Sequence, residues 1–238
     1  MKKKASSRPW IAIVVAVFVL GALGIGALIG ATSKEAGPGA NPGGAAEQET
    51  DHAARPLSEL ARRKADDPRA VGKADAPLVI IEFADFTCKY CGVFAVETLS
   101  ELKRDYVDTG KVRIEWRDAP ILGEKSVTTA VAARAAARQG RFWEYYDAVY
   151  RYGYDKAKDF SRETLVRLAQ KIKGMDLEAF TKDLDDPGLL DDVRAEGAES
   201  QALGVTSTPT FIVGEKVVQG AQGVDVFRQL IDAQLGTQ

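Results

Sequence analysis

The hydrophobic positions of this chain follow two patterns, one at its start and another over the remainder. Residues 10–31 form an apolar run without a charged residue, rich in Ile, Val, Ala, Leu and Gly. A helix of that length would span about 33 Å, close to the hydrocarbon thickness of a bilayer. Four basic residues precede the run, which predicts a cytoplasmic basic tip at residues 1–9, a transmembrane anchor at 10–31 and export of everything after it.

A cleaved signal peptide is the alternative interpretation of the same run. The apolar region of a signal peptide is usually about 7–15 residues long and ends in a small-x-small site. This run is longer and has Ile29 where a small residue is needed, so its length favours an uncleaved anchor. Either interpretation exports the domain that follows. Residues 32–68 are expected to be a flexible linker, with a short helix at 57–64 leading into the fold.

Beyond residue 68 the pattern alternates between that of strands and that of helices. Strand patterns cover residues 78–83, 111–116, 210–213 and 216–219, and the last two predict a hairpin. After the capping residue Thr87, a helix is predicted from Cys88 to about residue 108, and another closes the chain at 224–235. Between the second and third strands there are only helical patterns, at residues 127–139, 142–150, 162–172, 177–184 and 189–203. This order predicts an α/β sandwich at 69–238 with a helical insertion at about 120–203.

Composition and charge remove several classes of function. The 238 residues carry a formal net charge of −2 with a pI near 5.7, which argues against a general nucleic-acid-binding face. Two cysteines and one histidine are too few for a zinc finger or an iron–sulfur cluster within one chain, because such sites need about four ligands. The histidine, His52, lies in the expected linker and is not expected to serve a folded active site.

The candidate chemistry lies at Cys88-Lys89-Tyr90-Cys91. Two cysteines three positions apart at the start of a helix are one turn apart, close enough to form a small disulfide ring. The free amides and the positive dipole end of the helix favour a thiolate at Cys88, and only the thiolate attacks disulfides. Cys91, one turn further in, would open or close the ring, and Lys89 adds a cation near Cys88.

Two other interpretations of the cysteine pair stay open from the residues alone. The pair could be half of a zinc site shared across a dimer, although no second pair is present in the chain. It could also be a purely structural disulfide, but closing a four-residue loop gains little entropy. Export to an oxidising compartment and the strand–turn–helix context favour redox chemistry.

Two further residues have both an ordinary and a functional interpretation. Glu82 interrupts an apolar strand six residues before Cys88, where an acid commonly faces water. Its functional alternative is a buried carboxylate of raised pKa that exchanges a proton with Cys91. Pro209 precedes a strand, where a trans proline is ordinary; the functional alternative is a cis peptide that directs the Thr208 backbone at the cysteines.

The stretch APLVIIEFADFTCKYC at residues 76–91, with GVTSTPTFIV at 204–213, resembles the DsbA-like branch of the thioredoxin superfamily, and more narrowly its membrane-anchored BdbD-type members. The resemblance covers about residue 66 to the C-terminus. It implies a thioredoxin fold with an inserted helical cap domain, preceded by an N-terminal transmembrane helix and a flexible linker.

Carried over by position, the resemblance makes Cys88 the nucleophile, Cys91 the resolving cysteine and Glu82 the buried acid. Thr208 and Pro209 become the substrate platform. Many family members have Pro-His or Pro-Tyr between the cysteines, whereas this chain has Lys89-Tyr90. A flexible ammonium is a weaker fixed charge than the usual histidine, which leaves the oxidising strength open.

The sequence thus predicts an extracytoplasmic thiol–disulfide oxidoreductase that donates disulfides to reduced, unfolded exported proteins. Phe86, Tyr90 and the cap helices are expected to line a shallow apolar surface for those chains, with Lys89 beside it. The resemblance implies a membrane quinone-linked partner for reoxidation, and no cofactor or metal is expected. One alternative is a reductase or isomerase of the same fold. The chain is expected to be a monomer, and a stable dimer would favour the isomerase. The other alternative is a non-catalytic tethered chaperone or binding module.

Overall fold

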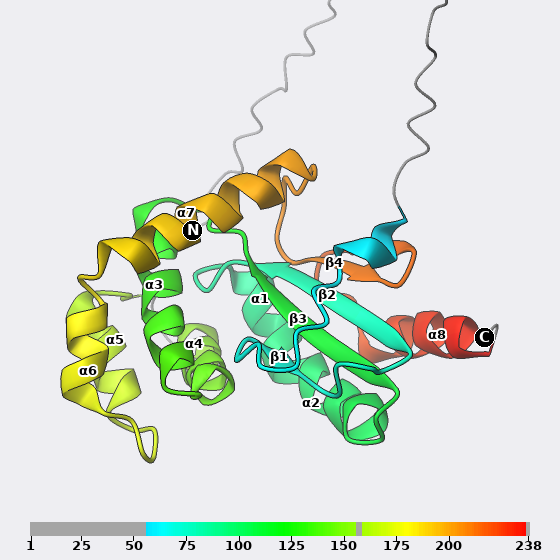
Figure 1. Ribbon diagram of the computed structural model, residues 1–238, viewed down its shortest axis with the longest axis horizontal. Coiled ribbons are helices and arrows are strands. Elements are labelled where there is room, and N and C mark those ends of the chain that lie inside the picture. Colours follow the sequence, from blue (N-terminus) through cyan, green and yellow to red (C-terminus); the bar gives the residue numbers. More distant parts are fainter. Residues whose placement is uncertain (1–55, 156–158, 237–238) are drawn as a thin grey trace, which may run out of the picture. The chain divides into compact units, whose positions relative to one another are not determined.

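The computed structural model describes residues 56–155 and 159–236 (Figure 1). Within these two stretches, no helix combines the length and the apolar character needed to cross a membrane. The expected basic tip at residues 1–9, the anchor at 10–31, most of the expected linker and His52 lie outside the described residues.

A five-stranded sheet forms the centre of the folded unit, in the order β1-β3-β2-β4-β5. β2 (Leu78–Ala84) and β3 (Val112–Asp118) run parallel, whereas β1 (Ala70–Val71), β4 (Thr210–Val213) and β5 (Lys216–Gln219) pair antiparallel with their neighbours. Every residue of β2 and β3 is buried, as in strands covered on both faces. β3 runs two residues beyond its predicted end, and β1 is an addition that the hydrophobic pattern did not predict.

One face of the sheet is covered by the helical run after β2 and by the closing helix. The run is α1 (Lys89–Val93), η2 (Phe94–Thr98), α2 (Leu99–Leu102) and η3 (Lys103–Val107), and the closing helix is α8 (Val224–Leu235). η2 and η3 are π-helical. The predicted helix is therefore confirmed in extent but contains two wider turns, and it buries Phe94 with Phe227 of α8 against the sheet.

The predicted helical insertion is confirmed. It consists of α3 (Glu124–Arg138), α4 (Phe142–Asp155), α5 (Arg162–Ala169), α6 (Leu177–Asp183) and α7 (Pro187–Ala202). Figure 1 shows α3 to α6 gathered beside the sheet and α7 running back over it. Alanines make up much of the buried side of α3, and such small side chains allow close approach of α4 and α7.

The opposite face of the sheet is covered by the chain that enters the fold, which we call the N-terminal strap (residues 56–69). Its η1 (Leu57–Leu60) places Leu57 and Leu60 against a buried cluster that includes Val79 and Ile81 of β2. The expected linker ended at residue 68, but this packing makes the N-terminal strap part of the folded unit.

Two carboxylates hold the N-terminal strap by its backbone. Glu215, in the β4–β5 turn, accepts hydrogen bonds from the amides of residues 57 and 58 at 2.8 and 3.1 Å. Glu115 of β3, fully buried, accepts the amides of residues 62 and 63 at 2.8 Å each. Bonds between a carboxylate and amide donors are charge-assisted and hence stronger than neutral ones.

A buried cluster of charges joins the N-terminal strap to the insertion. Glu196 of α7, 5% exposed, accepts hydrogen bonds from Arg69 at 2.6 Å, from Arg134 of α3 at 2.8 Å and from Arg62. Although burial opposes ionisation, these arginines hold the pKa of Glu196 below its usual range. The same carboxylate accepts the backbone amide of Asp118 at 3.0 Å, so the cluster also fixes the end of β3.

Candidate active site

The turn between β2 and α1 places the first cysteine at the start of the helix. The Asp85 carboxylate accepts the backbone amide and the hydroxyl of Thr87, both at 2.8 Å, and the Asp85 carbonyl accepts the Cys88 amide at 3.0 Å. Cys88 is the N-cap residue of α1, with φ −75° and ψ 125°. The sequence pattern predicts Thr87 as the capping residue. Its hydroxyl instead donates to the Asp85 carboxylate and lies 2.9 Å from the hydroxyl of Ser126.

The two cysteines differ in exposure and in acidity. Both are free thiols; Cys88 is 9% exposed and Cys91 is fully buried. A hydrogen bond from Cys91 is the main influence that lowers the pKa of Cys88 to about 6. Burial and the hydrogen bond to Cys88 raise the pKa of Cys91 well above its usual value. The pair therefore combines a slightly exposed thiol of lowered pKa with a fully buried thiol of raised pKa.

The peptide bond between Thr208 and Pro209 is cis, as the functional interpretation predicted. The Cys88 thiol donates to the Thr208 carbonyl with Sγ 3.3 Å from the oxygen. β4 begins directly after Pro209 and pairs with β2, which is why residues 120 positions apart in the sequence meet here.

The structure contradicts the interpretation in which Glu82 faces water. Glu82 is fully buried in β2, the central strand, between Trp116 of β3 and Phe211 of β4 in the strand register. Its carboxylate accepts a hydrogen bond from the Tyr146 hydroxyl, 3.1 Å from Oε1 and 3.4 Å from Oε2. Burial raises the pKa of Glu82 to about 8, and the bond from Tyr146 opposes that rise.

The residues expected to form the apolar surface separate into two groups. Tyr90 is 61% exposed and Lys89 is also exposed, so both are available beside Cys88. Phe86 is instead a core residue, 2% exposed, because its ring stacks on Tyr150 and packs against Trp116 with centroids 5.2 and 4.6 Å apart. The expectation that Phe86 contacts substrate is therefore corrected.

Three aromatic residues near the cysteines were missed by the sequence reasoning. Tyr146 and Tyr150 lie one helical turn apart on α4, and the Tyr150 hydroxyl donates to the Asp85 carbonyl at 3.1 Å. Trp116 donates its ring N–H to Asp118 at 2.8 Å and packs under Phe86. The aromatic run of residues 142–150 indicated a helix, but nothing in it signalled contact with a strand some sixty positions earlier.

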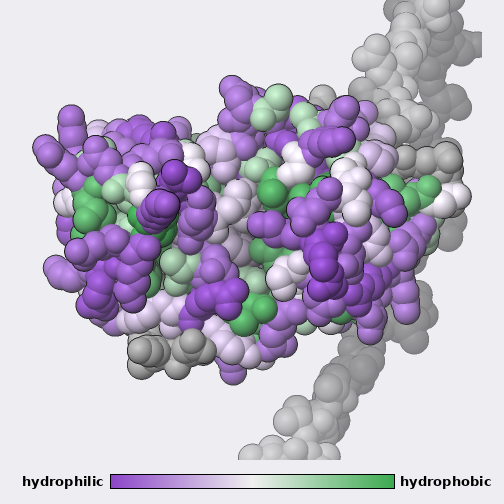
Figure 2. Space-filling model, turned by 90° about the horizontal axis from the view of Figure 1, so that it is seen from below, coloured by the Kyte–Doolittle hydropathy of each residue, from purple (hydrophilic) through white to green (hydrophobic). Residues whose placement is uncertain are grey.

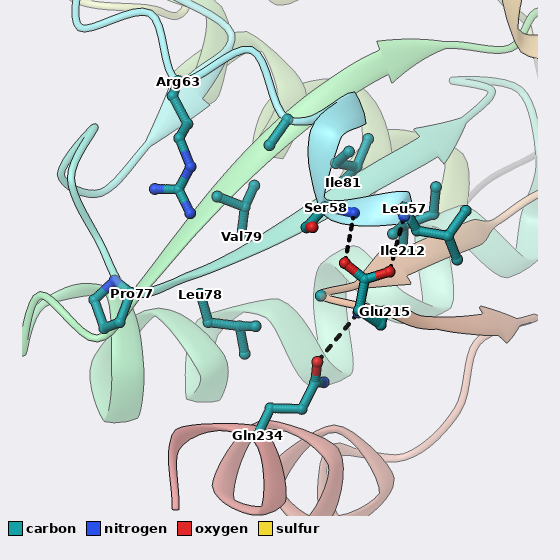
Figure 3. A pocket seen from close by; sticks show the side chains of 12 residues that line it. Leu57, Ser58, Arg63, Pro77, Leu78, Val79, Ile81, Ile212, Glu215 and Gln234 are labelled. Carbon is teal, nitrogen blue, oxygen red and sulfur yellow. Dashed lines mark hydrogen bonds between the residues drawn. The ribbon is translucent and has the colours of Figure 1, made fainter. Parts of the chain in front are cut away.

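A cavity of about 300 Å³ lies on the other face of the sheet and is separate from this site (Figure 3). Its apolar lining includes Val79, Ile81 and Ile212 of the sheet and Leu57 of the N-terminal strap. The carboxylate at its rim, Glu215, already holds the N-terminal strap. Elsewhere, Figure 2 shows one face on which hydrophilic residues predominate and hydrophobic residues form small separate groups.

Residues 56–155 and 159–236 hold no group of three or more His, Cys, Asp or Glu side chains placed to bind a metal ion. The chemistry that the described residues can offer is that of the two sulfurs: a two-electron exchange between a dithiol and a disulfide, with Glu82 able to take up or return a proton.

Comparison with known proteins agrees with this chemistry. A family model described as thioredoxin matches residues 64–233. The probable disulfide bond formation protein D of Bacillus anthracis is 30% identical over 171 residues, which cover 70% of this chain and 78% of that protein. The crystal structure of oxidised BdbD from Bacillus subtilis superposes with a TM-score of 0.66 at 23% identity, covering 73% of this chain and 95% of that one. Wolbachia pipientis alpha-DsbA1 gives the same score and identity, covering 76% and 96%.

Proposed function

Because the chain belongs to the thioredoxin family, as a DsbA-like thiol–disulfide oxidoreductase, we propose that it donates disulfides to exported proteins through Cys88 and Cys91. The observation that carries the proposal is the asymmetry of the pair. Cys88 has a lowered pKa at the start of a helix, whereas Cys91 is buried with a raised pKa. Such a pair has one sulfur that accepts attack and leaves well, and one that stays inside.

The reaction proceeds in two exchanges. A thiolate of the reduced protein attacks Cys88 Sγ, the Cys88–Cys91 bond breaks, and Cys91 leaves as a thiolate that takes a proton from Glu82. A second thiolate of the substrate protein then attacks the substrate sulfur that is bonded to Cys88 in the mixed disulfide, and Cys88 leaves as a thiolate. The substrate gains a disulfide, and the cysteine pair gains two electrons.

The surroundings of Cys88 have defined roles in this scheme. Thr208, before the cis proline Pro209, offers its backbone to an extended substrate chain beside the reacting sulfur. Tyr90 and Lys89 supply exposed contacts next to it.

The direction of exchange follows from the stability of the Cys88 thiolate. A Cys88 pKa of about 6 lies between about 7 for thioredoxin and about 3.5 for DsbA. Since a more stable thiolate makes the reduced form more favourable, we expect a potential between about −270 and −120 mV. A potential close to −270 mV would favour the alternative function, that of a reductase. The Cys88 pKa is lowered only modestly, so it is compatible with both functions.

The location and the reoxidising partner belong to the same proposal. Disulfide donation requires an oxidising compartment, which places the folded unit outside the cytoplasm. The apolar run at residues 10–31 would anchor it at the membrane. There a quinone-linked membrane protein would accept the two electrons from Cys88 and Cys91.

Two variants test the function. The oxidised full chain is mixed with a reduced, unfolded model protein, and disulfides in that protein are counted by mass spectrometry. Cys88→Ser should abolish the transfer of disulfides that the wild type shows. If the chain were only a binding module, the wild type would also show no transfer, and Cys88→Ser would bind the model protein as the wild type does. Cys91→Ser should accumulate a mixed disulfide on Cys88 when offered an activated substrate disulfide. Equilibration with glutathione mixtures then gives the potential and decides between donor and reductase.

A further inference from the structure

The helical insertion reaches into the reaction centre at one point, where Tyr146 meets Glu82. Tyr146 belongs to α4, is 2% exposed, and donates its hydroxyl to the Glu82 carboxylate. Within the described stretches of the chain, no other group forms a hydrogen bond with that carboxylate. A buried carboxylate of the central strand thus depends for its solvation on a side chain from a different layer of the fold.

The position of the Tyr146 ring is firmly fixed. Its ring packs edge-on against Trp116 at 5.6 Å, against Tyr150 at 4.7 Å and against Phe86 at 6.1 Å between centroids. These neighbours leave the ring little freedom to turn, so the hydroxyl is held at the carboxylate. A donor fixed in this way loses little conformational entropy when it forms its hydrogen bond, so it can support the Glu82 carboxylate effectively.

The other titratable groups around Glu82 are few. Cys91 of α1 interacts with it, as does Tyr150 of α4, whose hydroxyl is committed to a backbone carbonyl. The neighbours of Glu82 on β3 and β4 are an indole and a phenyl ring, which carry no charge. No cation of the described residues interacts with the carboxylate, so the neutral hydroxyl is the group that stabilises its ionised form.

We propose that Tyr146 is a positioning residue for disulfide exchange, which keeps the Glu82 carboxylate available as the base for the Cys91 thiol. The proposal rests on the proposed function and concerns the step that closes the ring. In that step the Cys91 S–H passes its proton to the Glu82 carboxylate. The Cys91 thiolate then attacks Cys88 Sγ in a mixed disulfide, the Cys88–Cys91 bond forms, and the partner leaves as a thiolate.

The hydroxyl acts more strongly on this step than on its reverse. Burial alone favours the protonated acid, which can return a proton to Cys91 but cannot accept one. A hydrogen bond from Tyr146 favours the ionised form and moves the pKa of Glu82 downward, toward neutrality. A cation in the same place would lower the pKa of Glu82 more strongly and so favour the ionised base over the proton donor. A neutral donor preserves both directions.

The test compares the wild type with Tyr146→Phe, Glu82→Gln and Tyr145→Phe. Tyr145 is the matched control, because it is the adjacent buried tyrosine of α4 and donates its hydroxyl to the Leu165 carbonyl at 3.2 Å, away from Glu82. Both phenylalanine variants remove one buried hydroxyl from the same helix. They differ in which acceptor is left without its donor.

The first readout is the pH dependence of ring closure. The reduced full chain is mixed with excess oxidised glutathione, quenched in acid, and the decay of the Cys88–glutathione adduct is followed by mass spectrometry. In Tyr146→Phe the midpoint of the plot of closure rate against pH should rise by about one pH unit, and ring closure at neutral pH should slow about tenfold. Glu82→Gln should lose this ionisation, and Tyr145→Phe should follow the wild type. A Tyr146→Phe profile that coincides with that of Tyr145→Phe would overturn the proposal.

A second readout does not need activity. In the oxidised protein, the NMR signal of the Glu82 carboxyl carbon, identified by its absence in Glu82→Gln, should titrate at higher pH in Tyr146→Phe. If that variant fails to fold, fluorotyrosine can be placed at position 146 instead. It is a stronger hydrogen-bond donor than tyrosine and should move the midpoint of the Glu82 titration to lower pH. An unchanged midpoint in either variant contradicts the proposal. Absence of disulfide transfer in the wild type would refute the proposed function, while this titration would still test Tyr146.

Discussion

Replacing Glu82 by glutamine should change how the stability of the fold depends on pH. Burial raises the pKa of Glu82 from 4.5 to about 8 in the folded protein. Between these values the folded protein keeps the proton that the unfolded chain has lost, so the free energy of unfolding falls as the pH rises. The stabilisation from this proton is complete below pH 4.5 and is lost as the pH passes through about 8. At 1.36 kcal/mol per pKa unit, the loss is on the order of 5 kcal/mol.

Denaturant titrations of the oxidised protein at several pH values measure this effect without interference from the thiols. Glu82→Gln keeps the size of the side chain and an acceptor for the Tyr146 hydroxyl, but it has no proton to lose. The variant should therefore become more stable relative to the wild type as the pH rises toward 8. Glu163→Gln, which removes an exposed carboxylate from α5, serves as the control and should run parallel to the wild type. If the Glu82→Gln curve were also parallel, Glu82 would not be a protonated buried acid.

Three further predictions concern the thiolate, the charge cluster and one turn. The ultraviolet absorbance of the Cys88 thiolate should titrate near pH 6, and Cys91→Ala should raise this midpoint because it removes the main hydrogen bond to the sulfur; a wild-type midpoint near that of a free thiol would contradict the assignment. Glu196→Ala should lower the free energy of unfolding by about 3–5 kcal/mol, since it leaves three partly buried arginines without their shared buried carboxylate. Denaturant unfolding measures this loss, and a loss below about 1 kcal/mol, as for a surface ion pair, would contradict the prediction. Gly72→Ala should lower the melting temperature more than Gly123→Ala. Both glycines have positive φ, but only at Gly72 would a Cβ lie 2.6 Å from a backbone oxygen. Equal losses would show that the close approach is relieved.

The order of helices and strands could be predicted because it follows from the period and the length of the hydrophobic segments along the chain. The apolar run of β2, the helices of the insertion and the closing hairpin and helix all lie close to their predicted places. The N-terminal strap could not be predicted, because its attachment uses backbone amides and partners more than fifty residues away. The same holds for the cluster around Glu196, whose arginines are spread over more than seventy positions.

The candidate site was predictable to the extent that its residues are close in sequence or belong to a motif. Cys88, Cys91 and the proline turn were found in this way. Phe86 was misplaced because adjacency to a reactive residue says nothing about which way a side chain points, and here the ring turns into the core. Tyr146 was missed because a hydrogen bond between a helix of the insertion and the central strand leaves no local pattern.

The way in which the N-terminal strap is held has a consequence for mutational tolerance. Glu215 and Glu115 bind backbone amides, which every residue except proline presents in the same form. The side chains at positions 57, 58, 62 and 63 can therefore be exchanged without loss of these four bonds, provided that no proline is introduced. Substitution of either glutamate removes two bonds at once. A mutational scan should find these four bonds insensitive to the strap's own side chains and sensitive to substitution of Glu115 or Glu215. Positions 57 and 62 are constrained in other ways, because Leu57 packs against β2 and Arg62 binds Glu196.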